Sequence, residues 1–76
     1  MSVRHPGEFL RFLLFEEEML THDAAERSGL SVAEIGDFIA GRAHVTPELA
    51  QKLSKLGGTK PAMWLQMQAD FDQSVR

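Results

Sequence analysis

Apolar residues along the chain recur at spacings of three and four positions, and no segment shows sustained alternation of apolar and polar residues. Such spacing gathers apolar side chains on one face of a helix, so the sequence predicts an all-α protein. A first helix opens at Pro6-Gly7, and its apolar stripe comprises Phe9, Leu10, Leu13, Leu14 and Met19. Phe12 and Phe15 widen this stripe, so we expect the helix to be buried on more than one face.

Capping residues divide the middle of the chain into two short helices. Thr21 is a favoured N-cap residue for a helix over 22–28. Gly29 follows at the position where helices commonly end in the left-handed conformation. Ser31 and Glu34 then form a Ser-x-x-Glu capping box, which predicts the start of another helix.

Two further helices are predicted in the second half of the chain. Thr46, Pro47 and Glu48 supply an N-cap, a proline at the first helical position and an acid in the first turn. We expect this helix to end at Leu56, before the two glycines at 57–58. A fifth helix is predicted over about residues 60–73, with an apolar stripe made of Met63, Trp64, Met67 and Phe71.

The segment from Thr21 to Gly41 has the organisation of a helix-turn-helix, because two short helices are joined by a tight turn that contains glycine. Its buried positions are predicted to be Ala24, Ala25, Leu30, Ile35, Phe38 and Ile39. In this motif the second helix enters the major groove of DNA. The residues that it would turn outward are Val32, Ala33, Glu34, Gly36 and Asp37.

The length of 76 residues suits a single helix-turn-helix domain over residues 1–76. The chain has no cysteine, which excludes a disulfide framework and a thiolate zinc site. Its net charge of −3 is unusual for a DNA-binding domain, because the neutralisation of phosphates supplies much of the affinity for DNA. No signal peptide or membrane-spanning stretch is recognisable, so we expect a cytoplasmic protein that does not contact a membrane.

The sequence offers no arrangement of residues that suits catalysis. His5, His22 and His44 lack the i, i+4 spacing of a metal site and have no cysteine to assist them. No nucleophile–base pair, phosphate-binding glycine loop or cofactor motif is present either. We therefore expect no metal, no cofactor and no enzymatic activity.

Three features keep more than one interpretation. Trp64 and its neighbouring methionines indicate a core or a dimer seam more than a ligand pocket. The glutamate run at 16–18 is either a solvated surface or one that attracts a basic protein surface. A local basic cluster either faces phosphates or is a solvated helix face; its members are Lys52, Lys55 and Lys60.

Three separated motifs carry a resemblance to a known family. The sequence His-Pro-Gly-Glu-Phe-Leu at 5–10 is similar to an opening His-Pro-Gly-Glu-x-Leu. Ala-Gly-Arg at 40–42 and Val-Thr-Pro-Glu at 45–48 are similar to Asn-Gly-Lys and Ile-Thr-Pro-Glu. Met-Trp-Leu-Gln-Met-Gln at 63–68 is similar to Phe-Trp-Leu-Asn-Leu-Gln. In this order, they resemble the HigA/VapI-type antitoxins of the Xre, lambda-repressor-like helix-turn-helix family.

This resemblance implies a compact five-helix domain that forms a homodimer. It further implies a repressor that binds double-stranded operator DNA in its own operon and neutralises a cognate toxin of the HigB type. By the same resemblance, the contacts to DNA would come from Thr21, His22, Ser31, Val32, Ala33, Glu34, Asp37, Arg42 and Thr46. Met63, Trp64, Met67 and Phe71 would form the dimer or core seam.

The predicted DNA-reading helix departs from the family pattern. It carries Glu34 and Asp37 where the family offers neutral or basic side chains, and Gly36 where serine is common. From Thr21 to Thr46, two arginines stand against four acidic residues, a balance of −2. The departures leave two other functions open: a protein-interaction module with weak or lost DNA binding, and a phage or plasmid repressor without a toxin.

Overall fold

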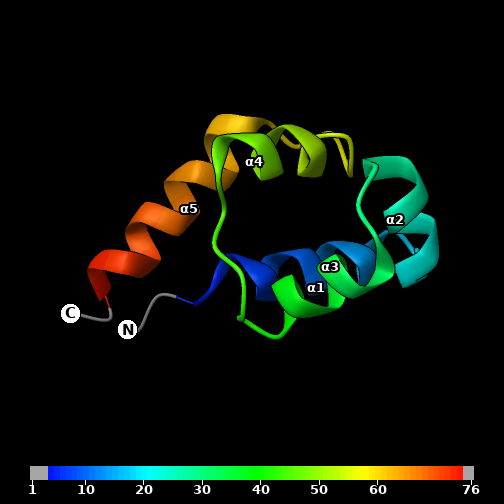
Figure 1. Cartoon of the computed structure of the whole chain (residues 1–76), viewed down its shortest axis with the longest axis horizontal. Coiled ribbons are helices and arrows are strands. Elements are labelled where there is room, and N and C mark those ends of the chain that lie inside the picture. The colour runs from blue at the N-terminus through cyan, green and yellow to red at the C-terminus, as the bar shows by residue number, and fades with distance from the viewer. Residues whose placement is uncertain (1–3, 75–76) are drawn as a thin grey trace.

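A computed structural model describes residues 4–74 of the chain, which form five helices and no strand within that range. The helices are α1 (Pro6–Glu16), α2 (Thr21–Ser28), α3 (Val32–Ile39), α4 (Pro47–Leu53) and α5 (Pro61–Ser74). Helices α1 and α3 lie side by side, α4 packs against α5, and α2 closes one end of the molecule (Figure 1). The all-α, five-helix prediction is therefore confirmed.

The start of α1 is fastened to the chain beyond α3 by His5. Its Nδ1 accepts a hydrogen bond from the backbone N–H of Gly7 at 2.9 Å, so Nε2 carries the proton that is donated to the carbonyl oxygen of Ala43, also at 2.9 Å. The imidazole ring also packs edge-on against Phe38 and Phe71. One side chain thus caps α1 and joins three distant parts of the chain.

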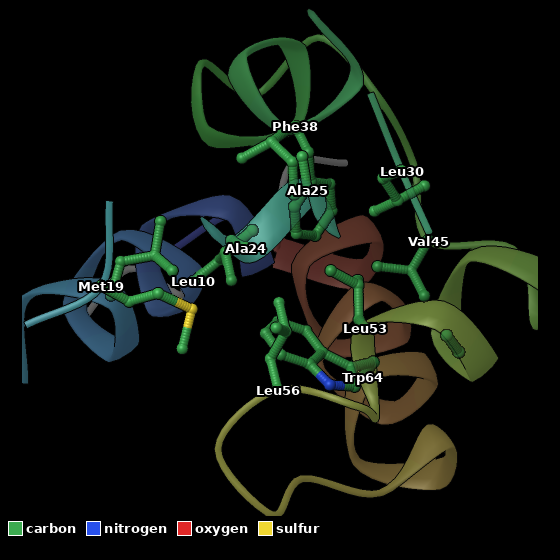
Figure 2. Close-up of a cluster of buried hydrophobic side chains, with 13 residues drawn as sticks. Leu10, Met19, Ala24, Ala25, Leu30, Phe38, Val45, Leu53, Leu56 and Trp64 are labelled. Carbon is green, nitrogen blue, oxygen red and sulfur yellow. The ribbon is translucent and has the colours of Figure 1, made fainter. Parts of the chain in front are cut away.

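The helices meet around Trp64, whose side chain is fully buried. Figure 2 shows side chains from all five helices converging there. The indole Nε1 donates to the hydroxyl of Thr59 at 2.9 Å, and that hydroxyl donates to the carbonyl oxygen of Leu56 at 2.8 Å. The buried apolar residues are Leu10, Leu14, Met19, Ala24, Ala25, Leu30, Ile35, Phe38, Val45, Ala50, Leu53, Leu56 and Trp64.

A buried glutamine holds the connection between α3 and α4 against α5. The Oε1 atom of Gln68 accepts a hydrogen bond from the backbone N–H of Val45 at 2.8 Å. Its Nε2 donates to Asp72 at 2.9 Å and lies 3.2 Å from Nδ1 of His44. Gln68 therefore satisfies a buried backbone donor that has no partner in a helix.

Two helix boundaries differ from the sequence prediction. Thr21 is the first residue of α2 and not its N-cap, which is Leu20. The carboxylate of Asp23 accepts the backbone N–H of Leu20 at 3.3 Å, so an acid in the first turn caps this helix. Helix α4 ends at Leu53 instead of Leu56, because the chain tightens into turns in which Leu56 is buried.

The expectation that α1 is buried on more than one face is wrong for this chain. Helices α3 and α5 pack against α1 along a stripe that buries Leu10 and Leu14. Phe9 lies at the border of that stripe, while Phe12 is 50% exposed and Phe15 is 82% exposed. The described residues cover Phe12 by half and leave Phe15 mostly exposed, although the apolar pattern of the helix is correct.

The fifth helix buries its apolar stripe unequally. Trp64 lies in the core, whereas Met63, Met67 and Phe71 are half-buried at its border. Within residues 4–74, no helix is both long enough and apolar enough to cross a membrane.

Two glycines should respond in opposite ways to alanine. A Cβ atom at Gly7 would overlap the carbonyl oxygen of Phe38, whereas one at Gly36 would meet nothing within 4 Å. We expect Gly7→Ala to destabilise the protein by about 1–3 kcal/mol, because α1 and α3 must separate. Gly36→Ala should stabilise it by up to about 1 kcal/mol through helix propensity. Urea unfolding followed by circular dichroism measures both, and equal stabilities would contradict this packing.

Candidate nucleic-acid interface

Helix α2, the turn at Gly29 and α3 form the helix-turn-helix. Gly29 ends α2 in the left-handed conformation, with φ of 83°. The buried hydroxyl of Ser28 donates to the carbonyl oxygen of Ala24 at 2.7 Å and accepts the backbone N–H of Leu30 at 3.3 Å. Of the predicted buried positions, Ile39 is half-buried and the rest are buried: Ala24, Ala25, Leu30, Ile35 and Phe38.

The outward face of α3 contains the residues expected from the sequence. Val32, Ala33, Glu34, Gly36 and Asp37 are all exposed. The helix begins with the predicted capping box. Ser31 Oγ accepts the backbone N–H of Glu34, and Glu34 Oε1 accepts the backbone N–H of Ser31, both at 3.0 Å. The carboxylate of Glu34 is thus turned back toward the start of its own helix.

The capping box also sets the charge of Glu34. The hydrogen bond from the backbone N–H of Ser31 lowers the pKa of Glu34 below its ordinary 4.5, and the hydrogen bond with the Ser31 side chain lowers it further. The positive charge of Lys52 on α4 contributes in the same direction. Glu34 therefore carries a full negative charge at neutral pH.

The second acid of α3 has an internal partner. The Nε and Nη2 atoms of Arg42 lie 3.2 and 3.0 Å from Oδ1 of Asp37. Both side chains are exposed, so the pair adds little to stability. It does balance the charge of Asp37 with a cation that follows α3 in the chain.

The remaining predicted contacts lie at the starts of α2 and α4. Thr21 and His22 open α2, where His22 Nε2 lies 3.3 Å from Asp23 Oδ1. Thr46 caps α4, and its hydroxyl accepts the backbone N–H of Leu49 at 3.1 Å. The structure brings Thr46 together with Glu34, since both line one shallow hollow between α3 and α4.

Lys52 lines the same hollow, although it was not among the predicted contact residues. The sequence signal was its membership of a basic cluster, which did not show that α4 places it beside α3. Gln68, which fixes the chain before α4, ends the motif at 63–68 that carries the family resemblance, but periodicity alone does not mark a buried glutamine. Within residues 4–74, no group of three or more His, Cys, Asp or Glu side chains is arranged to hold a metal ion.

A helix-turn-helix family model matches residues 14–64, which is more than half of the chain. The protein belongs to the helix-turn-helix family. Its matched segment includes all of α2, α3 and α4 and the end of α1.

Known relatives of this helix-turn-helix protein include regulators and antidote proteins. An uncharacterized HTH-type transcriptional regulator, YddM of Escherichia coli K12, is 32% identical over 63 residues, 83% of this chain and 67% of YddM. An addiction module antidote protein of the HigA family from Coxiella burnetii has a TM-score of 0.86 at 29% identity, covering 99% of this chain and 83% of its own.

A second similar structure is a proposed antidote protein of a plasmid maintenance system from Nostoc punctiforme PCC 73102. Its TM-score is 0.88 at 32% identity, with 96% of this chain and 80% of that chain covered. These similarities extend over nearly the whole chain and include α1 and α5. The resemblance to HigA-type antitoxins that the motifs indicated is confirmed.

The cap of α3 should make stability depend on pH. Because the folded pKa of Glu34 is lowered, its contribution is present above the unfolded pKa and is lost as the pH falls through the folded pKa. We expect Glu34→Gln, which keeps a capping oxygen, to lose less stability than the wild type as the pH falls below 4.5. Urea unfolding in acidic and neutral buffers measures the difference. Identical pH profiles would exclude this role of the Glu34 charge.

Proposed function

We propose that this protein is an antitoxin-type transcriptional regulator that binds operator DNA through α3. The observation that carries this proposal is the exposed face of α3, held on a helix-turn-helix within a fold shared with a HigA-family antidote protein. An α-helix presented in this way fits the major groove of B-DNA. The similarity to a transcriptional regulator of E. coli supports the same function.

The proposed interface extends beyond α3 to the helix starts beside it. With α3 in the groove, Thr21 and His22 at the start of α2 would contact phosphates through their side chains and the free backbone N–H groups of that helix. Thr46 at the start of α4 and Arg42 after α3 would contact phosphates through their side chains. Ser31, Val32, Ala33, Glu34 and Asp37 would face the bases.

A homodimer on a palindromic operator completes the proposal. Two copies would place their α3 helices in successive major grooves, about 34–36 Å apart. For the dimer seam we propose the border of α5, where Met63, Met67 and Phe71 are half-buried. Trp64 lies beneath them in the core.

The acidic side chains of α3 are compatible with DNA binding because their charge is used internally. Asp37 is paired with Arg42, and Glu34 caps the helix that carries it. The net charge of −3 nevertheless weakens attraction to phosphates at long range. We therefore propose a regulator whose affinity for DNA depends on specific contacts more than on general charge.

Gel retardation with the DNA upstream of its own gene tests this function. The wild type should retard that DNA at low salt, with affinity falling as salt rises because phosphate contacts contribute to it. The double variant Glu34→Gln, Asp37→Asn should bind non-specific DNA more tightly, by up to roughly five-fold per charge removed. Absence of retardation at low salt would contradict operator binding. An unchanged non-specific affinity would mean that α3 does not face DNA.

A second function, capture of a protein partner, is favoured by the surface of α1. Phe12 and Phe15 are exposed, and Leu20 beyond the helix is 63% exposed. Phe15 and Leu20 line one open hollow together with Glu16 and Glu18. Large apolar groups exposed together commonly mark protein interfaces.

We propose that the cognate HigB-type toxin occupies this surface. The apolar side chains of such a partner would cover the aromatic rings. Its basic side chains would pair with Glu16 and Glu18, because opposite charges attract across an interface. Neutralisation of that toxin and repression of the shared operon would follow from binding both partners. If a toxin binds to α1 and the protein does not bind DNA, the protein is an interaction module. The acidic residues of α3 left this second function open.

Replacing the two aromatic rings tests the toxin surface. We expect Phe12→Ser, Phe15→Ser to weaken binding of a toxin encoded beside the gene by about 30-fold or more, because exposed aromatic anchors dominate such interfaces. The matched control is Val32→Ser, which removes an exposed apolar side chain from α3 instead. It should leave toxin binding unchanged in isothermal titration calorimetry. Equal effects of the two variants would exclude α1 as the toxin surface.

A further inference from the structure

The two carboxylates on the outward face of α3 are exposed, and both form hydrogen bonds with other groups of the same chain. Glu34 Oε1 accepts the backbone N–H of Ser31, which directs this carboxylate along the helix start. Asp37 Oδ1 accepts two hydrogen bonds from Arg42. The side chains that could distinguish bases by hydrogen bonding are therefore oriented by the fold of the protein itself.

The other outward side chains of α3 are small and apolar. Val32 is the first residue of the helix and is 52% exposed, and Ala33 beside it is also exposed. Gly36, one turn further on, has no side chain, and a Cβ atom there would meet nothing within 4 Å. The middle of this face therefore has no side chain at Gly36, and the methyl groups of Val32 and Ala33 lie at the start of the helix.

The edges of base pairs in the major groove offer one apolar group, the C5-methyl of thymine. All the other groups that distinguish bases there are hydrogen-bond donors or acceptors. A valine side chain gains nothing by contacting hydrogen-bond donors and acceptors in place of water. Contact with a methyl group is favourable, because it removes apolar surface of both groups from water. The chemistry of Val32 and Ala33 therefore suits thymine better than any other base.

We propose that Val32 and Ala33 read thymine by its methyl group, so that the operator carries thymine opposite the start of α3. This inference rests on the proposed function, in which α3 lies in the major groove. It adds the class of base that this chain prefers and the residues that set the preference. Each methyl contact is worth about four-fold in affinity, the effect of burying one such group.

Thymine and deoxyuridine differ only in this methyl group, so they provide the test. Sites bound by the wild type are first selected from a random duplex library. The enriched duplex is then resynthesised with deoxyuridine for thymine in one half-site or in both. We expect about four-fold weaker binding for one half-site and about fifteen-fold for both.

Protein variants assign the effect to α3. Val32→Ser should prefer the thymine duplex less strongly than the wild type does, because the methyl group keeps only Ala33 as an apolar partner. Phe15→Ser is the matched control, since it removes an exposed apolar side chain from α1. It should keep the full preference of the wild type for thymine.

The binding measurements test methyl recognition, its assignment to Val32 and the DNA-binding function separately. Equal binding of the thymine and deoxyuridine duplexes by the wild type overturns methyl recognition while leaving operator binding intact. A preference for thymine that Val32→Ser leaves undiminished overturns the assignment to this residue. If the random library yields no enriched duplex, the proposed DNA-binding function itself fails.

Discussion

The orientation of α3 depends on the close contact between its end and the start of α1. Gly7 lies so near the carbonyl oxygen of Phe38 that a larger residue would force the helices apart. His5 completes this contact by capping α1 and donating to Ala43 just beyond α3. Because α3 carries the proposed reading face, this packing sets the angle at which that face meets DNA.

Helix α3 must be held in a helical conformation and must also present a surface to DNA, and its acidic residues affect both. A helix of 8 residues is too short to be stable by itself, so its cap and its packing must hold it in place. Glu34 contributes to the cap, and Asp37 engages the arginine that follows the helix. The charge of Glu34, which would oppose phosphate, is thus part of the cap that keeps α3 formed. The other exposed residues of α3 are small and apolar: Val32, Ala33 and Gly36.

The molecule separates two surfaces of different chemistry on two helices. The outward side of α1 is aromatic, with glutamates at its C-terminal end and two arginines and a glutamate beside Phe12, and it is the surface proposed for a protein partner. The outward side of α3 lies beside the start of α4, where Glu34 and Thr46 line one hollow, and it is the surface proposed for DNA. Because the two surfaces use different residues, the proposed binding of DNA and the proposed binding of a protein partner would not compete for the same side chains.

Most helix starts and ends were determined by the sequence, because caps act over three or four residues and leave a local pattern; the start of α2 and the end of α4 differ from it. The Ser31–Glu34 box, the left-handed Gly29 and the Thr46 cap all lie where the sequence predicts them. Tertiary structure alone decided which apolar faces are covered, so the same pattern buries Leu14 and exposes Phe15. It also decided the bonds from His5 to Ala43 and from Val45 to Gln68, which join residues 38 and 23 positions apart. No local pattern encodes such contacts, because they form only when the helices pack.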